Sequence, residues 1–172
     1  GNWMTWHKSL TGTGPYVILN STNAATTGAW NNTNPTSTVF SLLGADTDEN
    51  ASGSTYVAYV WAEIAGFSKF GSYAGNGSSD GPFIYCGFRP KYIMTKASST
   101  TGSWRMRDTS RDTYNVSQNI LIADTAAAEV VDNQVDILSN GFKLRNSLAG
   151  ENASGSTYIY AALSLIHISE PT

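Results

Sequence analysis

Short apolar runs, separated by stretches of Gly, Ser, Thr and Asn, set the pattern of this chain. Several runs alternate apolar and polar residues with period two, which is typical of half-buried antiparallel strands. In KYIMTK, for example, Tyr92 and Met94 are expected on one face. The runs are FIYCGF (Phe83–Phe88), KYIMTK (Lys91–Lys96), SWRMR (Ser103–Arg107), NILIA (Asn119–Ala123), VDIL (Val135–Leu138), GFKLR (Gly141–Arg145) and TYIYAA (Thr157–Ala162). This pattern predicts an all-β fold.

Turn residues sharpen the prediction. Asn140-Gly141 lies between two apolar runs and predicts a tight hairpin, because both residues tolerate positive φ. Only TAAAEV, at Thr125–Val130, favours a helix, and one short turn is expected there. Several short strands joined by turns favour an antiparallel β-sandwich or jelly roll.

The string ENASGSTY occurs twice, at Glu49–Tyr56 and at Glu151–Tyr158, 102 positions apart. Repeats of this kind indicate a duplicated unit. Weaker matches at offsets of 101 to 103 extend the similarity towards the N-terminus. They pair Phe40 with Phe142, Leu42 with Leu144, Leu19 with Ile122, Gly1 with Gly102 and Trp3 with Trp104. The sequence therefore predicts tandem β-sandwich repeats, a truncated one at residues 1–66 and a nearly complete one at residues 67–162.

The first repeat is expected to lack its opening third, since Gly1 aligns with Gly102. The counterpart of Phe70–Thr101 would then precede Gly1, and strand edges in the first repeat would be unpaired. The glycine-rich stretch Tyr73–Pro82 is interpreted as an ordered loop that opens the second repeat, because aromatic residues flank it and flexible linkers rarely have them.

The last ten residues, LSLIHISEPT at Leu163–Thr172, depart from the repeat. They resemble the in-frame translation of a transposase adapter used in DNA sequencing libraries. On this interpretation residues 163–172 are an artefact, the chain is a fragment of an environmental (metagenomic) read, and His167 belongs to no site.

Composition and charge narrow the classes of function that the chain could have. Apolar residues make up 41% and charged residues only 13%, with a net charge of −3. This balance argues against nucleic-acid binding, which needs a basic face. No apolar run has membrane-spanning length, so no membrane partner is expected. The single cysteine, Cys86, has no partner for a disulfide within the chain.

No residue is predicted to be catalytic, and neither a metal nor a cofactor is expected. His7 lacks an orienting carboxylate and a nucleophile in sequence, and its aligned region in the second repeat has no histidine. Asp46–Asn50 has alternating oxygen ligands that could suit Ca²⁺, but the second repeat loses both aspartates. An acidic, solvated turn is the preferred interpretation.

Four residues are candidates for ligand binding. Trp6 and Trp30 have no aromatic counterpart in the other repeat and are expected to be exposed, whereas Trp3 and Trp104 are assigned to cores. Arg105 and Arg107 belong to the densest charge cluster, which could line a polar groove. The preferred alternative is a set of exposed cross-strand ion pairs that each contribute ~0–1 kcal/mol.

The strings FGSYAGNGSSDGPFIYCGFRPKYIMTK, SNGFKLR and ENASGSTYIYAA resemble a repeated β-rich domain of unknown function from virion structural proteins of tailed bacteriophages, especially tail and tail-fibre proteins of marine phages. That domain is similar in strand layout to laminin-G and concanavalin-like jelly rolls.

The resemblance implies a place in the phage tail after synthesis in the host bacterial cytoplasm, with other tail subunits or further copies of the chain as partners. Three functions follow in order of preference. They are a non-enzymatic structural or interaction module, a glycan-binding module that contacts a host-surface carbohydrate, and a depolymerase. The depolymerase ranks last, because it needs two facing carboxylates, and Glu63, Glu129 and Asp136 are scattered singly.

Overall fold

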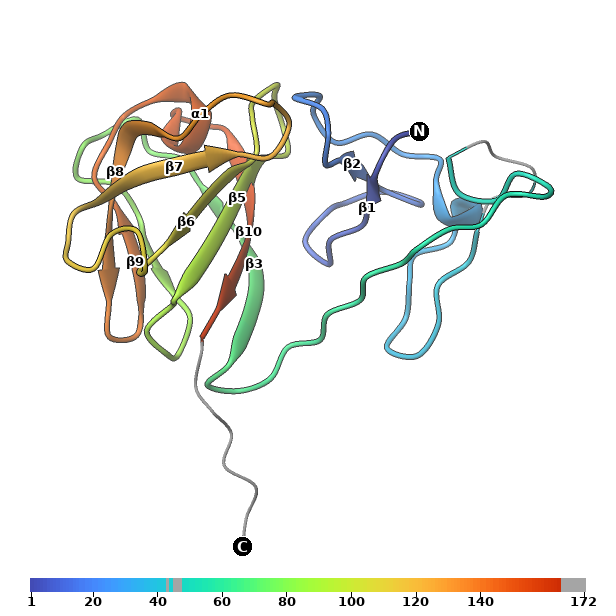
Figure 1. Cartoon of the computed structure of the whole chain (residues 1–172), viewed down its shortest axis with the longest axis horizontal. Helices are drawn as coiled ribbons and strands as arrows, with labels where there is room; N and C mark the ends of the chain where they lie inside the picture. The colour runs from blue at the N-terminus through green and yellow to red at the C-terminus, as the bar shows by residue number, and fades with distance from the viewer. Residues whose placement is uncertain (43, 45–47, 165–172) are drawn as a thin grey trace, which may run out of the picture.

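The computed structural model describes residues 1–42, 44 and 48–164. Figure 1 shows two lobes, which we call the first lobe (residues 1–66) and the second lobe (residues 67–164). Across the described residues, strands dominate the regular structure and helix is confined to two single turns. The prediction of an all-β fold is therefore confirmed.

Within the described residues, the second lobe is built on one antiparallel sheet of eight strands in the order β3-β10-β5-β6-β7-β8-β9-β4. Its strands are β3 (Ser68–Ala74), β4 (Phe83–Tyr85), β5 (Tyr92–Ala97), β6 (Arg105–Asp108), β7 (Ser117–Ile122), β8 (Val130–Leu138), β9 (Gly141–Leu144) and β10 (Thr157–Leu163).

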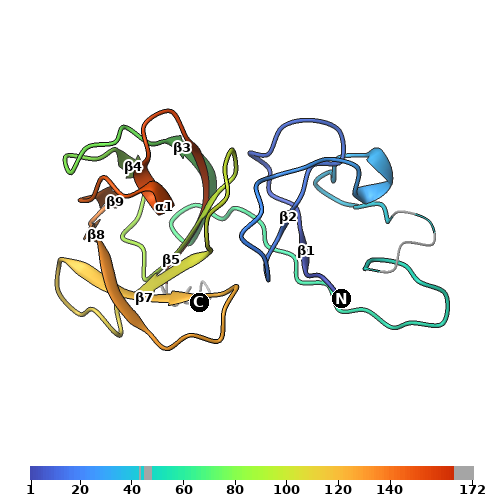
Figure 2. The ribbon, with the colours of Figure 1, turned by 90° about the horizontal axis from the view of Figure 1, so that it is seen from above.

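The sheet curls until it is nearly closed, with β3 and β4 as its two edges. Seen from above in Figure 2, the strands surround a common interior. Apolar side chains from both ends of the sheet fill this interior. Strands β3, β5 and β10 at one end and β4, β8 and β9 at the other contribute to one apolar cluster. Tyr73, Phe142, Tyr158 and Tyr160 form its aromatic part, and Tyr73 stacks on Tyr158 with ring centroids 5.1 Å apart. The finer assignment to tandem sandwich or jelly-roll repeats stays a prediction.

The hairpin predicted at Asn140-Gly141 is confirmed, and its glycine has a different role from the one expected. Leu138 pairs with Gly141 across the β8–β9 turn, so Gly141 is the first residue of β9. A Cβ atom on Gly141 would lie 2.0 Å from the carbonyl oxygen of Ile84 in β4. Glycine is needed here because the backbone of β4 approaches closely.

The short helix expected at Thr125–Val130 is wrong. A turn begins after β7, residues 126–129 form coil, and Val130 starts β8. Six residues are too few to nucleate a helix without tertiary support. The helical turn α1 (Ala149–Asn152) lies instead at the start of the second ENASGSTY string. There the backbone N–H of Leu148 donates to Asn146 Oδ1 and the Tyr158 hydroxyl donates to the carbonyl oxygen of Ala149.

The first lobe contains little regular structure. Strands β1 (Met4–Thr5) and β2 (Val17–Ile18) form a two-stranded antiparallel sheet, and η1 (Trp30–Asn32) is a single 3₁₀ turn. The β1–β2 sheet is the counterpart of β6–β7, because Met4 pairs with Ile18 as Arg105 pairs with Ile122. Ile18 is thus the structural counterpart of Ile122, whereas the sequence alignment matched Ile122 with the next residue, Leu19.

The two lobes contact each other through buried groups. Leu10 and Val17 pack with Trp104 and Ile159 in one apolar cluster. The Trp104 indole donates to the carbonyl oxygen of Ile18 at 2.9 Å. Burial lowers the pKa of Lys96 to about 8, and its Nζ donates to three carbonyl oxygens, those of Thr22, Asn23 and Ala97.

The last strand, β10, runs one residue beyond the boundary expected at Ala162. The N–H of Lys91 donates to the carbonyl oxygen of Leu163, and the N–H of the buried Ser164 donates to that of Phe67, both at 2.7 Å. The rest of the stretch interpreted as adapter-derived, residues 165–172, lies outside the described residues. No helix within the described residues has the length and apolarity needed to span a membrane.

Candidate functional site

The first ENASGSTY string leads into a segment with no regular structure, which we call the connecting segment (residues 55–63, TYVAYVWAE). It runs as the link between the two lobes in Figure 1. The loop before it folds as in the second copy. The N–H of Ala51 donates to the Tyr56 hydroxyl at 2.8 Å, and the N–H of Ala153 donates to that of Tyr158 at 2.9 Å. Both copies therefore specify the same local turn.

The side chains beyond the turn differ in environment between the copies. Tyr158, Ile159 and Ala162 of β10 are at most 1% exposed. Their counterparts Tyr56, Val57 and Val60 are 44%, 66% and 77% exposed. Monomeric proteins rarely expose contiguous apolar surface of this kind without a function. The connecting segment is therefore the strongest candidate for a functional surface.

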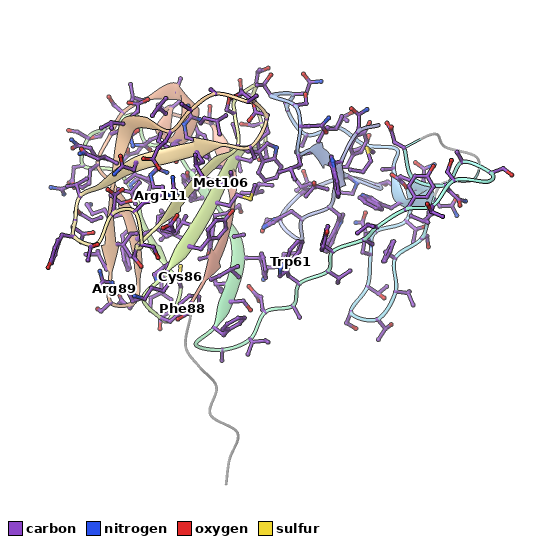
Figure 3. All side chains as sticks on the ribbon, in the orientation of Figure 1. Trp61, Cys86, Phe88, Arg89, Met106 and Arg111 are labelled. Carbon is purple, nitrogen blue, oxygen red and sulfur yellow. The ribbon has the colours of Figure 1, made fainter. Side chains whose placement is uncertain are left out.

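An aromatic row lies on this surface, formed by Trp3, Tyr59 and Trp61. Tyr59 stacks between the two indoles, with ring centroids 6.3 Å from Trp3 and 6.1 Å from Trp61 and interplanar angles of 23° and 30°. Each of the three side chains is at least half exposed. Figure 3 shows Trp61 on the link between the lobes. Three stacked, solvent-facing rings can accept the face of a sugar or the apolar side chains of another protein.

Contacts with both lobes hold the C-terminal end of the connecting segment in place. Glu63 Oε1 lies 2.6 Å from Lys8 Nζ and 3.3 Å from Lys69 Nζ, and it accepts a hydrogen bond from the N–H of Phe70. Partial burial acts to raise the pKa of Glu63, but these three partners outweigh it and hold the pKa at about 2. Ser68 Oγ donates to the carbonyl oxygen of Ala62. One end of the exposed surface is thus fixed relative to β3.

The tryptophans predicted to bind ligand are not the exposed ones. Trp30 is buried, its Nε1 donates to the carbonyl oxygen of Pro15, and its ring meets Phe40 edge to face. Trp6 is half-buried, and no described residue hydrogen-bonds its buried Nε1. Trp3, which was assigned to a core, is exposed, whereas its counterpart Trp104 is buried. The expectation of exposure was therefore wrong for Trp30, and the core assignment was wrong for Trp3.

The arginines of the predicted groove lie elsewhere than expected. Arg107 is buried and holds Glu151 through two bonds, Nη1 to Oε1 at 2.5 Å and Nη2 to Oε2 at 2.7 Å. Thr95 Oγ1 also donates to Glu151 Oε1. Arg105 is half-buried, and its Nη1 donates to the carbonyl oxygen of Gly150 at 2.9 Å. Arg107 therefore forms neither a groove nor an exposed ion pair, and its role is to brace α1.

The second copy of ENASGSTY carries a second buried polar centre at Asn152. Its Nδ2 donates to Asn76 Oδ1, to the carbonyl oxygen of Ser78 and to that of Asn146, while its Oδ1 accepts the N–H of Asn76. These bonds order the glycine-rich stretch after Tyr73, as the sequence predicted. The buried residues of the second copy, Glu151 and Asn152, therefore hold neighbouring segments in place.

Other titratable side chains also form hydrogen bonds within the structure. His7 is buried between the lobes, where its Nδ1 accepts the N–H of Ser9 and its Nε2 donates to the carbonyl oxygen of Tyr160. That pair of bonds requires the neutral imidazole, and burial lowers the His7 pKa accordingly. Asp46 of the acidic stretch lies outside the described residues, and Asp48 accepts two hydrogen bonds from Asn2.

A depression of about 330 Å³ lies over β7, β8 and the segment that follows β9, and residues including Gln118, Asp132, Gln134 and Arg145 line it. Its lining within the described residues contains no aromatic ring. Arg145 at its edge is paired with Asp136 at 3.3 Å. The depression therefore lacks the stacking surface that the aromatic row offers.

A family model described as a domain of unknown function (DUF7483) matches residues 1–165. The chain belongs to the DUF7483 family. The match runs through the boundary expected between residues 66 and 67. No curated protein and no solved structure matches the chain.

Proposed function

We propose that this DUF7483 chain is a non-enzymatic structural and interaction module of a phage tail or tail-fibre protein. The observation that carries the proposal is the exposure of the connecting segment. Its apolar side chains face solvent although the corresponding side chains of β10 are buried in a sheet. Exposed apolar surface of this kind is typical of protein interaction sites. The resemblance of the repeat strings to virion domains supports a place in the tail.

The hydrogen bonds and ion pairs of the polar groups support a non-enzymatic function. Glu151 is held by Arg107, His7 is fixed in its neutral form, and Asp112 accepts bonds from Ser117 and from the N–H groups of Gln118 and Asn119. Groups engaged in this way stabilise loops and strand ends. On this proposal the chain is made in the bacterial cytoplasm and joins the virion, where other tail subunits or further copies of the chain are its partners.

Virion proteomics tests the proposal. Particles of a phage that encodes this chain, purified by density gradient, should contain its peptides at structural abundance, and the DNA polymerase of the same phage serves as the control for carry-over. Peptides at or below the level of the polymerase would remove the virion assignment.

Glycan binding is the second candidate, and the aromatic row favours it. Sugar rings stack on exposed aromatic faces, and Trp3, Tyr59 and Trp61 present such faces in a row. A host-surface carbohydrate would be the ligand. On an array of bacterial envelope glycans, Trp61→Ala should abolish binding and Tyr114→Ala, which removes an exposed aromatic in the second lobe, should not. Equal binding by both variants, or none by the parent chain, would exclude the row as a sugar site.

A further inference from the structure

Strand β10 has a neighbour on both of its edges. Its register places Tyr158 opposite Tyr73 of β3 and Ala97 of β5, and Leu163 opposite Ser68 and Tyr92. Both neighbours precede β10 in the chain by many residues. The closing strand of the repeat is therefore a central strand, completed by two strands from the opening part of the same unit.

Among its described residues, the first lobe contains the counterparts of β6, β7 and β10 and no counterpart of β3 or β5. Its β1 corresponds to β6, its β2 to β7, and the connecting segment to β10. In the second lobe β5 lies between β6 and β10. In the first lobe Trp3, next to β1, stacks directly on Tyr59 of the connecting segment, and no strand of the described residues lies between them.

We propose that the connecting segment is an acceptor strand for two antiparallel strands of the β3 and β5 type, supplied by another unit of the same repeat. The occupant is a segment equivalent to Phe67–Thr101, which contains β3, β4 and β5. Strand addition of this kind supplies main-chain hydrogen bonds along both edges of the acceptor. The inference rests on the proposed interaction role of the connecting segment, and it does not depend on a place in a virion.

The side chains of the connecting segment suit this occupant. In β10, Tyr158, Tyr160 and Ala162 enter the main core, whereas Ile159 joins the cluster that contains Trp104. The same alternation puts Tyr56, Ala58 and Val60 on the first face and Val57, Tyr59 and Trp61 on the second. Trp3, the counterpart of Trp104, already contacts the second face through Tyr59. An added strand pair would hydrogen-bond to the two edges of the connecting segment, and its side chains would flank Tyr56, Ala58 and Val60 on the first face as Tyr73 of β3 flanks Tyr158.

The unsatisfied indole of Trp6 agrees with an incomplete unit. Trp6 follows β1 and corresponds to Arg107, which in the second lobe reaches Glu151 beside Thr95 of β5. The buried Nε1 of Trp6 has no acceptor among the described residues. An added β5-type strand would lie next to β1, where it can offer backbone carbonyl oxygens.

The test supplies the proposed occupant in the full chain. A second copy of residues 67–101 is fused before Gly1, so that its Thr101 joins Gly1 as Thr101 joins Gly102 in the natural order. Amide hydrogen exchange of residues 55–63 is then measured with and without the added segment. The control carries Met94→Pro and Thr95→Pro in the added copy, because consecutive prolines remove one ladder N–H towards each neighbour.

We expect exchange in residues 55–63 to slow at least about 100-fold in the fused chain, because ladder amides exchange only when the sheet opens. The double-proline control should lose this protection at the amides that point towards the added β5-type strand. Unchanged exchange in the fused chain would overturn the inference. So would a dimer of the unmodified chain in which residues 55–63 are already protected, since the occupant would then be a second copy in place of the strand pair.

The outcomes separate this inference from the proposed function. A fused chain with protected amides, together with absence from purified virions, would remove the virion assignment and leave the acceptor strand standing. Presence in virions together with unprotected amides would do the reverse.

Discussion

Glu151→Gln is expected to be the most destabilising single change among the polar residues of the second lobe. The substitution preserves size, but it leaves the buried Arg107 guanidinium without a counter-charge. Removing one partner of a buried ion pair costs about 3–5 kcal/mol, because the remaining charge stays desolvated. The Thr95 hydroxyl, which donates to Glu151 Oε1 at 2.8 Å, meets an amide in place of a carboxylate. We therefore expect a loss of roughly 3 kcal/mol or more in the free energy of unfolding.

Urea denaturation followed by far-UV circular dichroism measures this loss, and Asp136→Asn is the matched control. Asp136 pairs with Arg145 at 3.3 Å on a partly exposed face, and such pairs contribute ~0–1 kcal/mol. The double variant Arg107→Met with Glu151→Leu should recover most of the loss, since apolar replacement of a buried pair is often neutral. A cost for Glu151→Gln no larger than that of Asp136→Asn would refute the reasoning.

Three further changes test other parts of the structure. Gly141→Ala should cost about 1–3 kcal/mol in urea denaturation, because its Cβ would clash with the carbonyl oxygen of Ile84. Asn152→Ala should destabilise by about 1–3 kcal/mol through its lost buried hydrogen bonds, whereas Asn50→Ala, the exposed counterpart, should change stability little; equal effects would contradict this. The depressed pKa of Glu63 stabilises the fold above pH 4.5, and this contribution is lost as the pH falls towards about 2. The gap between urea midpoints of the parent chain and Glu63→Gln should therefore shrink from about pH 5 to about pH 3, and a constant gap would argue against the ion pairs.

The strands and the repeat could be predicted from sequence because they depend on local signals. Period-two alternation located β5, and the Asn140-Gly141 pair located the β8–β9 hairpin. The exact repeat of ENASGSTY predicted a shared turn, which both copies form through a tyrosine hydroxyl. Strand order was beyond these signals, because the pairing of β4 with β9 joins segments far apart in the sequence.

The candidate site could not be predicted because exposure depends on neighbours that the local pattern does not reveal. Trp3 and Trp104 occupy equivalent positions, yet only Trp104 is covered, since the first lobe packs against it through Leu10 and Val17. Trp30 is buried, its ring meets Phe40, and its indole donates to the carbonyl oxygen of Pro15. Arg107 and Glu151 are far apart in sequence, so their ion pair gave no local signal. The sequence did differ next to the two identical strings: DTD precedes the first and LAG the second, and VAYVW follows the first and IYAAL the second. This difference was the available signal that the two copies lie in different environments.

Comparison of the two copies distinguishes structure that the local sequence determines from structure that forms only when neighbouring strands are present. The ENASGSTY turn forms in both lobes, because its hydrogen bonds lie within the turn itself. The strand after it forms only in the second lobe, where β3 and β5 pair with both edges. A strand has no internal backbone hydrogen bonds, so it needs partners in a way that a turn does not. The connecting segment keeps the apolar character of a central strand while it lies exposed, and this mismatch is why we place the interaction surface of the chain there.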